Sequence, residues 1–387
     1  MSTRKERYIE LPQVSAGSLR LLKVVTYGSP DAEPKVYLQA SLHADELPGM
    51  MVLYKLQQLL NDIDSRGDIA GYIVIVPVAN PIGLAQRMQG NILGRLDFET
   101  GRNFNRGWGT GGDVDLVEDA ITRLDKANDT FGNDAIHNRQ LIAEALRQAV
   151  RSLPAFDEAA TLKRTLLELA IDADICLDLH CDNEAVMHMY THSDSWPRAR
   201  ELAVWMDCEA VFLAEESGGH PFDESVSRPW FEIAKHYAEV ALPDAPLSVT
   251  LELRGLGDVD ELLAATDAEH LVEFLKGEGV INGATATLPK VRCDATPLAG
   301  VEHIRATEAG LVSHCVAVGD QIKTGDTVAR IIDPMASFGD GVTELRAGTD
   351  GLVYARTHHR IIAPGDVVTG IAGSTPLAGK GSGLLTD

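Results

Sequence analysis

The sequence predicts an α/β fold followed by a smaller all-β region, and two observations support this prediction. Over the first 285 residues, apolar β-branched runs alternate with amphipathic helical patterns, which is typical of a sheet with helices on its faces. From about Pro289 the pattern changes to short β-like segments with glycines at their turns. A chain of 387 residues is long enough for two domains, and we expect them to cover residues 1–285 and 286–387.

The first strand of interest covers residues 36–42 and leads into the polar residues 43–46, after which apolar residues recur at helical spacing. Pro48 lies in the first turn of this helix, where a missing N–H group is tolerated. Residues 72–78 form a near-continuous apolar run, which is typical of a strand covered on both faces. The segment therefore predicts a strand, a loop, a helix and a second strand.

The middle of the chain continues the alternation. Residues 115–171 show helical periodicity interrupted by Pro154, which predicts two or three helices. Further strands are expected at 175–179, 186–190, 211–214 and 249–253, and further helices at 197–207, 224–241 and 259–277. In the β region, two similar stretches at 309–320 and 350–367 each place a Gly-Leu-Val strand before a Gly-Asp turn, which indicates a pseudo-duplicated β-module.

Composition excludes several classes of protein. Asp and Glu number 57 against 34 Lys and Arg, and the net charge of −23 would repel a phosphate backbone, so nucleic acid is not an expected partner. The longest apolar run, residues 72–79, is too short to span a membrane. The amino terminus shows no secretory signal, and five cysteines without a C-x-x-C pair suit reduced thiols. We expect a soluble cytoplasmic protein.

His43, Glu46 and His180 form the strongest candidate site. Each follows the end of a predicted strand, where open α/β sheets bind ligands. Two imidazoles and one carboxylate are a ligand set of catalytic zinc, with a fourth position left for water. The alternative is that His43 and Glu46 only decorate a helix start, where acidic residues are favoured by the helix dipole.

Two acidic residues accompany these candidates. Asp178 lies two residues before His180 on the same strand face and could orient its ring, or could be solvated or cap a turn. Glu252 interrupts an apolar strand, and a buried carboxylate is costly without a charge partner or a metal. It is therefore the best general-base candidate. The alternative for Glu252 is an ion pair with Arg254, two residues along.

The segment 94–106 concentrates three arginines and two asparagines in an otherwise acidic protein. Arginine side chains bind carboxylates with two parallel hydrogen bonds and stabilise developing oxyanions. On composition alone, the segment could equally be a surface loop that balances nearby acids.

Five separated motifs, in this order, resemble the succinylglutamate desuccinylase/aspartoacylase family of zinc hydrolases, relatives of the zinc carboxypeptidases. They are H-x-x-E after a strand, V-x-N-P, G-R-x-x-x-x-x-G-R-N-F-N-R, D-L-H and L-E-L-R-G, and the resemblance covers about residues 36–375. It implies a carboxypeptidase-like central mixed sheet flanked by helices. It also implies a C-terminal β-domain similar in part to a biotinyl/lipoyl module. No Met-Lys-Met-like acceptor lies between the half-repeats, which argues against a carrier role.

The resemblance also implies residue roles. His43, Glu46 and His180 would bind one zinc ion per chain, and Glu252 would activate the zinc-bound water. Arg95 would polarise the scissile carbonyl, with Arg102 as its rival. Asn105 and Arg106 would bind the substrate carboxylate, and Asn80 falls where the family has an asparagine near the site. The charges available for an anionic substrate are Arg95, Arg102, Arg106 and Arg254.

We therefore predict a zinc-dependent amidohydrolase that removes an acyl group from a small N-acylated amino acid or related amide. The alternatives are a zinc carboxypeptidase acting on short peptides and a non-catalytic zinc-containing binding protein. The chain could also form a homo-oligomer. It departs from the family pattern at Gly107-Trp108-Gly109-Thr110, where members commonly continue with x-Phe-Pro-Gly, and in the long helical stretch 115–171.

Overall fold

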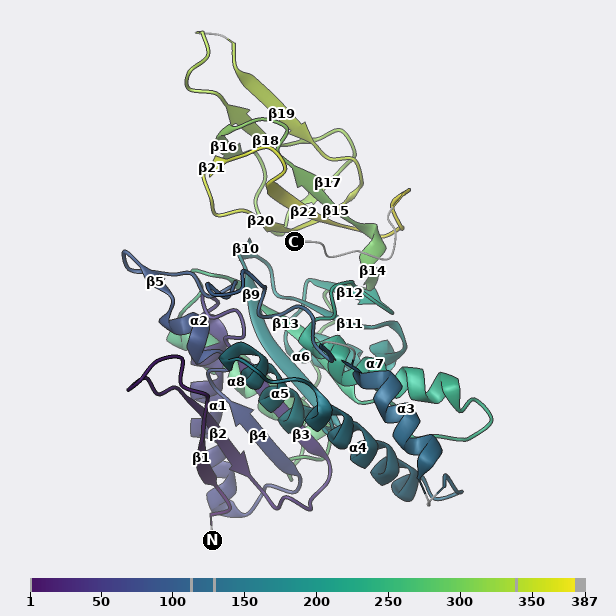
Figure 1. The fold of residues 1–387 in the computed structure, drawn as a ribbon. Helices are drawn as coiled ribbons and strands as arrows, with labels where there is room; N and C mark the ends of the chain where they lie inside the picture. Colours follow the sequence, from purple (N-terminus) through teal and green to yellow (C-terminus); the bar gives the residue numbers. More distant parts are fainter. Residues whose placement is uncertain (1, 112–113, 128–129, 338–339, 380–387) are drawn as a thin grey trace.

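A nine-stranded mixed sheet forms the centre of the computed structural model, which describes residues 2–111, 114–127, 130–337 and 340–379 (Figure 1). The strands β3, β4, β9 and β13 run parallel to one another, so their carboxyl ends meet at one edge. β1 and β2 add an antiparallel edge, and β11 runs antiparallel to β13. The strand order is β1 (Lys5–Glu10), β2 (Leu21–Tyr27), β4 (Tyr72–Val76), β3 (Lys35–Ala40), β9 (Ile175–Asp182), β13 (Leu247–Gly255), β11 (His188–His192), β12 (Ala210–Ala214) and β14 (Thr296–Pro297).

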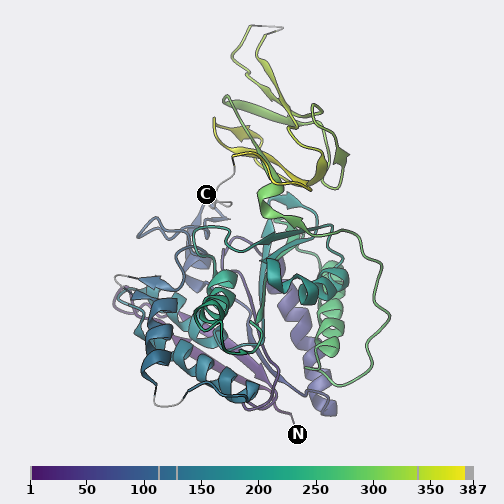
Figure 2. The ribbon, with the colours of Figure 1, turned by 90° about the vertical axis from the view of Figure 1, so that its right-hand side faces the viewer.

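Helices cover both faces of this sheet (Figure 2). Alternate side chains of β3 show why: Val36 and Leu38 pack into one apolar core, whereas Tyr37 packs into the other. The first core contains α1 (Pro48–Arg66), α6 (Trp196–Trp205) and α8 (Glu261–Gly277), and the second contains α3 (Leu116–Lys126), α4 (Ala135–Ser152), α5 (Glu158–Ala170) and α7 (Phe222–His236). Among the described residues, no helix combines the length and the apolarity that crossing a bilayer requires.

The predicted mixed sheet flanked by helices is confirmed, with local differences. The segment 115–171 forms three helices, and Pro154 lies between α4 and α5. β3 ends at Ala40 rather than at residue 42, because Ser41 takes a positive φ of 63° and turns the chain. The strands β1 and β2 were not predicted. The edge strand β1 is mostly polar and gives a weak signal, whereas β2 is mostly apolar and buried, and its strand signal was missed.

The smaller elements around the sheet lie in its loops. α2 (Pro81–Ala85) follows β4, and two short hairpins precede α3. These hairpins are β5 (Arg87–Met88) with β6 (Asn91–Ile92), and β7 (Thr110–Gly111) with β8 (Val114–Asp115). A 3-10 turn, η1 (Ser193–Ser195), precedes α6.

The C-terminal region is all β, as predicted, and contains two packed sheets. The two predicted Gly-Asp turns are equivalent: Gly319 and Gly365 both have positive φ, and Asp320 and Asp366 each accept a hydrogen bond of 2.8 Å from the backbone N–H three residues earlier. Gly325-Asp326 forms a further turn with the same features. The elements are η2 (Leu298–Gly300), β15 (Val301–Arg305), β16 (Gly310–His314), β17 (Gln321–Ile322), β18 (Thr327–Ile332), β19 (Val342–Arg346), β20 (Gly351–Arg356), β21 (Ile361–Ile362) and β22 (Val367–Gly373).

The β region is attached to the carboxyl edge of the central sheet (Figure 1). The short strand β10 (Glu184–Ala185), which follows β9, pairs with β20. Glu184 also forms ion pairs with Arg356 and Arg360. The division at residues 285 and 286 stays a prediction, and β14 still belongs to the central sheet ten residues later.

Candidate active site

The candidate ligands come from two adjacent parallel strands. β3 leads into the loop that carries His43 and Glu46, and β9 carries His180. The first turn of α1 packs closely against these strands at Gly49, where a Cβ would lie only 2.9 Å from the Cβ of Ala40. The close approach of the helix start to the sheet brings the loop beside His180.

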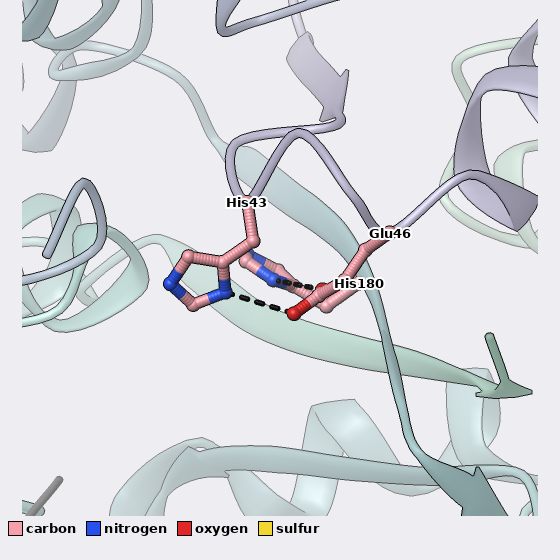
Figure 3. Close-up of side chains that lie close together, drawn as sticks. All are labelled: His43, Glu46 and His180. Carbon is pink, nitrogen blue, oxygen red and sulfur yellow. Dashed lines mark hydrogen bonds and ion pairs between the residues drawn. The ribbon is translucent and has the colours of Figure 1, made fainter. Parts of the chain in front are cut away.

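His43, Glu46 and His180 converge as the sequence predicted (Figure 3). Glu46 lies between the rings: its Oε1 is 2.9 Å from His43 Nδ1 and its Oε2 is 2.8 Å from His180 Nδ1. All three side chains are buried, and one donor atom from each lies within 4.8 Å of the others. Burial would raise the pKa of Glu46, but the two imidazoles outweigh it and hold that pKa well below its usual value.

The outer nitrogen of each ring also faces an oxygen. His43 Nε2 lies 2.8 Å from Asn103 Oδ1, which also accepts a hydrogen bond from the backbone N–H of Asn105. His180 Nε2 lies 2.9 Å from Asp178 Oδ2, at ion-pair distance. Such outer contacts orient metal-binding imidazoles. Asn103 was not among the predicted site residues, although it lies in the predicted loop.

Asp178 belongs to a buried polar chain. Tyr37 donates to Gln39 Oε1 at 2.8 Å, and Gln39 Nε2 donates to Asp178 Oδ1 at 3.0 Å. Both Gln39 and Asp178 are fully buried. The chain fixes the orientation of Asp178, which is neither solvated nor a turn cap.

Glu252 lies on β13 in register with His180 and lines the same cavity. Its Oε2 atom is buried with no hydrogen-bond partner among the described residues. Burial and the nearby Glu46 carboxylate raise the pKa of Glu252 well above its usual value. The alternative partner, Arg254, instead forms an ion pair with Asp267 of α8.

The arginine-rich segment borders the metal ligands. Arg95 Nη1 donates to Glu46 Oε1 at 3.1 Å, and 52% of the Arg95 side chain is exposed. Arg106 lines the cavity, and Asn105 Oδ1 accepts a hydrogen bond of 2.8 Å from the Phe222 N–H. Asn105 therefore joins the loop to the start of α7.

Three other predicted substrate contacts lie outside the lining of this cavity. Asn80 is fully buried, donates to the Leu42 carbonyl at 2.9 Å and caps α2, so it supports the loop before His43. Arg102 is exposed and lines a second cavity. Arg254 points toward α8.

The active-site cavity, about 610 Å³, extends from the metal ligands to the C-terminal β region. No sequence signal pointed to the residues from that region, because they are far in sequence from the metal ligands beside which they line the cavity. His358, for example, contacts Asn183 with Nδ1 and Oδ1 2.6 Å apart. The lining residues from the β region include His303, Arg305, Tyr354, Arg356, His358 and His359.

The chain belongs to the succinylglutamate desuccinylase/aspartoacylase family, since the family's catalytic-domain model matches residues 32–277. Among curated proteins, it is 25% identical over 351 residues to the N-alpha-acetyl-L-2,4-diaminobutyric acid deacetylase of Halomonas elongata, covering 88% of this chain and 82% of that protein.

Solved structures assigned to the same family share the fold. One from Shewanella frigidimarina NCIMB 400 has a TM-score of 0.80 and 24% identity, covering 96% of this chain and 98% of that chain. One from Shewanella amazonensis SB2B has a TM-score of 0.78 and 26% identity, covering 95% of this chain and 98% of that chain. The family and the deacetylase relative indicate a hydrolase that acts on amide bonds.

The contact between Asp178 and His180 gives a first prediction. In Asp178→Asn, we expect zinc affinity to fall by about 10- to 100-fold, because a neutral amide orients and polarises the His180 ring less well. Titration of the purified protein with zinc against a competing chelator measures this change. Asp62→Asn, an exposed change on α1, is the control; equal affinity in both variants would contradict the role of Asp178.

Proposed function

We propose that this protein is a zinc-dependent deacylase that hydrolyses the amide bond of small N-acylated amino acids. The observation that carries the metal assignment is the environment of His43. Its Nε2 faces an amide oxygen and its Nδ1 faces the Glu46 carboxylate, at 2.8 and 2.9 Å. A neutral imidazole has only one N–H, so one of these nitrogens directs a lone pair toward an oxygen. Arg95 Nη1, which lies 3.3 Å from His43 Nδ1 and 3.1 Å from Glu46 Oε1, already brings positive charge to this contact from one side.

Burial and the positive charge of Arg95 lower the pKa of His43, which disfavours the doubly protonated ring. His43, Glu46 and His180 would together hold a metal ion, which would supply positive charge to all three groups. Two imidazoles and one carboxylate are a donor set that suits zinc.

When bound, zinc would polarise a water molecule and the scissile carbonyl. Glu252 takes the proton of the attacking water as the oxygen adds to the carbonyl carbon. It then delivers that proton to the nitrogen as the C–N bond breaks, which releases a carboxylate and an amine. The raised pKa of Glu252 suits a group that must hold the proton between these two steps.

Arg95 is our choice for the residue that stabilises the oxyanion, because its guanidinium already reaches Glu46 and lies half-exposed on the cavity. Arg102 lies outside that cavity. Arg106 would bind the substrate carboxylate, and Asn105 would hold the loop that carries Arg106. The deacylase assignment is favoured over the two alternatives because the family and the relative named above are deacylases.

The role of Glu252 predicts a separation of catalysis from metal binding. In Glu252→Gln, kcat for an N-acetyl amino acid should fall by about 10²- to 10⁴-fold, because an amide cannot carry the proton, while zinc content stays unchanged. Steady-state kinetics with elemental analysis measures both, and Glu278→Gln, at the end of α8, is the control. Wild-type turnover in Glu252→Gln would exclude it as the general base.

The role of Arg106 predicts a substrate-dependent effect. In Arg106→Ala, KM should rise about tenfold or more for N-acetyl amino acids, since a charged hydrogen-bonding contact of about 1.5–3 kcal/mol is lost. The matched substrates are the same compounds as carboxamides, for which KM should change little. An equal rise for acids and amides would contradict carboxylate binding by Arg106.

A fourth prediction concerns the substrate side chain. Asp223 and Glu224, at the start of α7, line the cavity, and Asp223 is buried. Burial, followed by the charges of Glu224 and Asp178, raises the pKa of Asp223 to about 7. A substrate with a second amino group, as in the substrate named for the Halomonas relative, would place an ammonium group beside these acids.

We therefore expect kcat/KM for N-alpha-acetyl-2,4-diaminobutyrate to exceed that for N-alpha-acetyl-2-aminobutyrate, which lacks only the ammonium group. Because Asp223 gains its negative charge as the pH rises through about 7, the ratio should be larger at pH 8 than at pH 6. Asp223→Asn should reduce the ratio and its pH dependence. A ratio near one at both pH values would exclude this subsite.

A further inference from the structure

A second cavity, about 240 Å³, lies behind the loop that carries Asn103 and Arg106. It is formed by the segment 97–111, the residues between α4 and α5, and one face of α5. The residues 107–110, where the chain departs from the family pattern, contribute to this wall rather than to the active-site cavity. This second cavity has no part in the function proposed above.

The wall of the second cavity is largely apolar. Trp108, Leu153 and Leu167 are buried, and they face the cavity together with Pro154. Phe156 also lines it, yet 95% of this aromatic side chain is exposed. A large aromatic side chain left in water beside an apolar hollow is a feature of binding sites.

Three cations line the same cavity: Arg102, Lys163 and Arg164. Across the ranges that the structure describes, no carboxylate lies within ion-pair distance of any of them. Lys163 Nζ instead donates to the carbonyls of Arg106, at 2.6 Å, and Asn103, at 3.4 Å, and lies 5.5 Å from the centre of the Trp108 ring. Burial and the neighbouring charge of Arg102 lower the pKa of Lys163 to about 8.

The carboxylates of the two acidic residues that line the second cavity accept hydrogen bonds from backbone N–H groups. Asp97 accepts hydrogen bonds from the N–H groups of Glu99 and Thr100, and Asp157 caps α5 through the Ala160 N–H. The protein has a net charge of −23. Three cations that have no ion-pair partner within the described part of the chain, placed around one apolar hollow, are a favourable place for an anion.

We propose that the second cavity binds a small monocarboxylate with an apolar or aromatic tail, and that this ligand is coupled to the active site through Lys163. The carboxylate would contact the Lys163 ammonium and the Arg102 guanidinium. The tail would lie against Phe156 and Leu153.

The proposed coupling follows from the two backbone carbonyls to which Lys163 donates hydrogen bonds. Its two carbonyl partners belong to Asn103, whose side chain orients His43, and to Arg106, which lines the active-site cavity. A carboxylate on Lys163 competes for the same N–H groups, so ligand binding shifts the backbone that carries both residues. Lys163 is therefore a positioning residue.

Calorimetric titration of the purified, zinc-reconstituted full chain tests the binding, with benzoate as probe and benzamide as its neutral counterpart. We expect benzoate to bind at least tenfold more tightly than benzamide. Affinity for benzoate should fall at least tenfold in Lys163→Gln, which keeps N–H donors for the carbonyls, and severalfold in Phe156→Ala. Phe156 is exposed, so this variant should fold normally even if Lys163→Gln does not.

Arg106→Ala is the matched control in the other cavity and should change benzoate affinity by less than twofold. Benzoate binding that is lost in Arg106→Ala but kept in Phe156→Ala and Lys163→Gln would place the probe in the active-site cavity and overturn the proposal. Equal affinities for benzoate and benzamide would also overturn it. These titrations measure binding directly, so their failure is distinct from failure of the deacylase assignment.

Steady-state kinetics tests the coupling. Saturating benzoate should change kcat or KM without competing with substrate, and this effect should disappear in Lys163→Gln. Benzoate that binds in the titration but leaves both kinetic constants unchanged would show that the second cavity is not coupled to the active site.

Discussion

The site depends on one contact, the burial of the Glu46 carboxylate between the imidazoles of His43 and His180. Burying a carboxylate costs several kcal/mol unless positive charge or hydrogen bonds compensate it. Here both imidazoles contact the Glu46 carboxylate. Asn103 contacts the other nitrogen of His43, and Asp178 contacts the other nitrogen of His180. Gln39 in turn donates a hydrogen bond to Asp178. The lone pairs of the two imidazoles and of the Glu46 carboxylate would serve as ligands to a metal ion. A metal ion would also acidify a water molecule, and Glu252 on the next strand would accept its proton.

The α/β scaffold supports this contact through close packing. Gly94 approaches the loop so closely that a Cβ there would lie 2.5 Å from the Cβ of Ala44, and the Gly94 carbonyl accepts a hydrogen bond from the Ala44 N–H. Asn80 donates a hydrogen bond to the Leu42 carbonyl of the same loop. Hydrogen bonds therefore hold the loop that carries His43 and Glu46 at two positions before any ligand binds, which is the preorganisation that a metal site requires.

The sequence predicted the elements whose signals are local. The positions of His43, Glu46 and His180 after strand ends made them candidate ligands, which the family resemblance supported, and Glu252 was a candidate because it is a carboxylate inside an apolar strand. Arg254 shows where such reasoning fails: a shift of register after Glu252 and a φ of 62° at Arg254 break the rule that residues two apart share a strand face. Asn103 and the histidines of the β region could not be assigned, because loop side-chain directions and contacts over long sequence separations leave no periodic pattern.

The most direct test of the zinc site is the metal content of the purified protein, measured by elemental analysis for the wild type, His180→Ala and the control His270→Ala on α8. We expect one zinc ion per chain in the wild type and the control, and none in His180→Ala. Absence of zinc from the wild type after reconstitution, or full retention of zinc in His180→Ala, would contradict the zinc assignment.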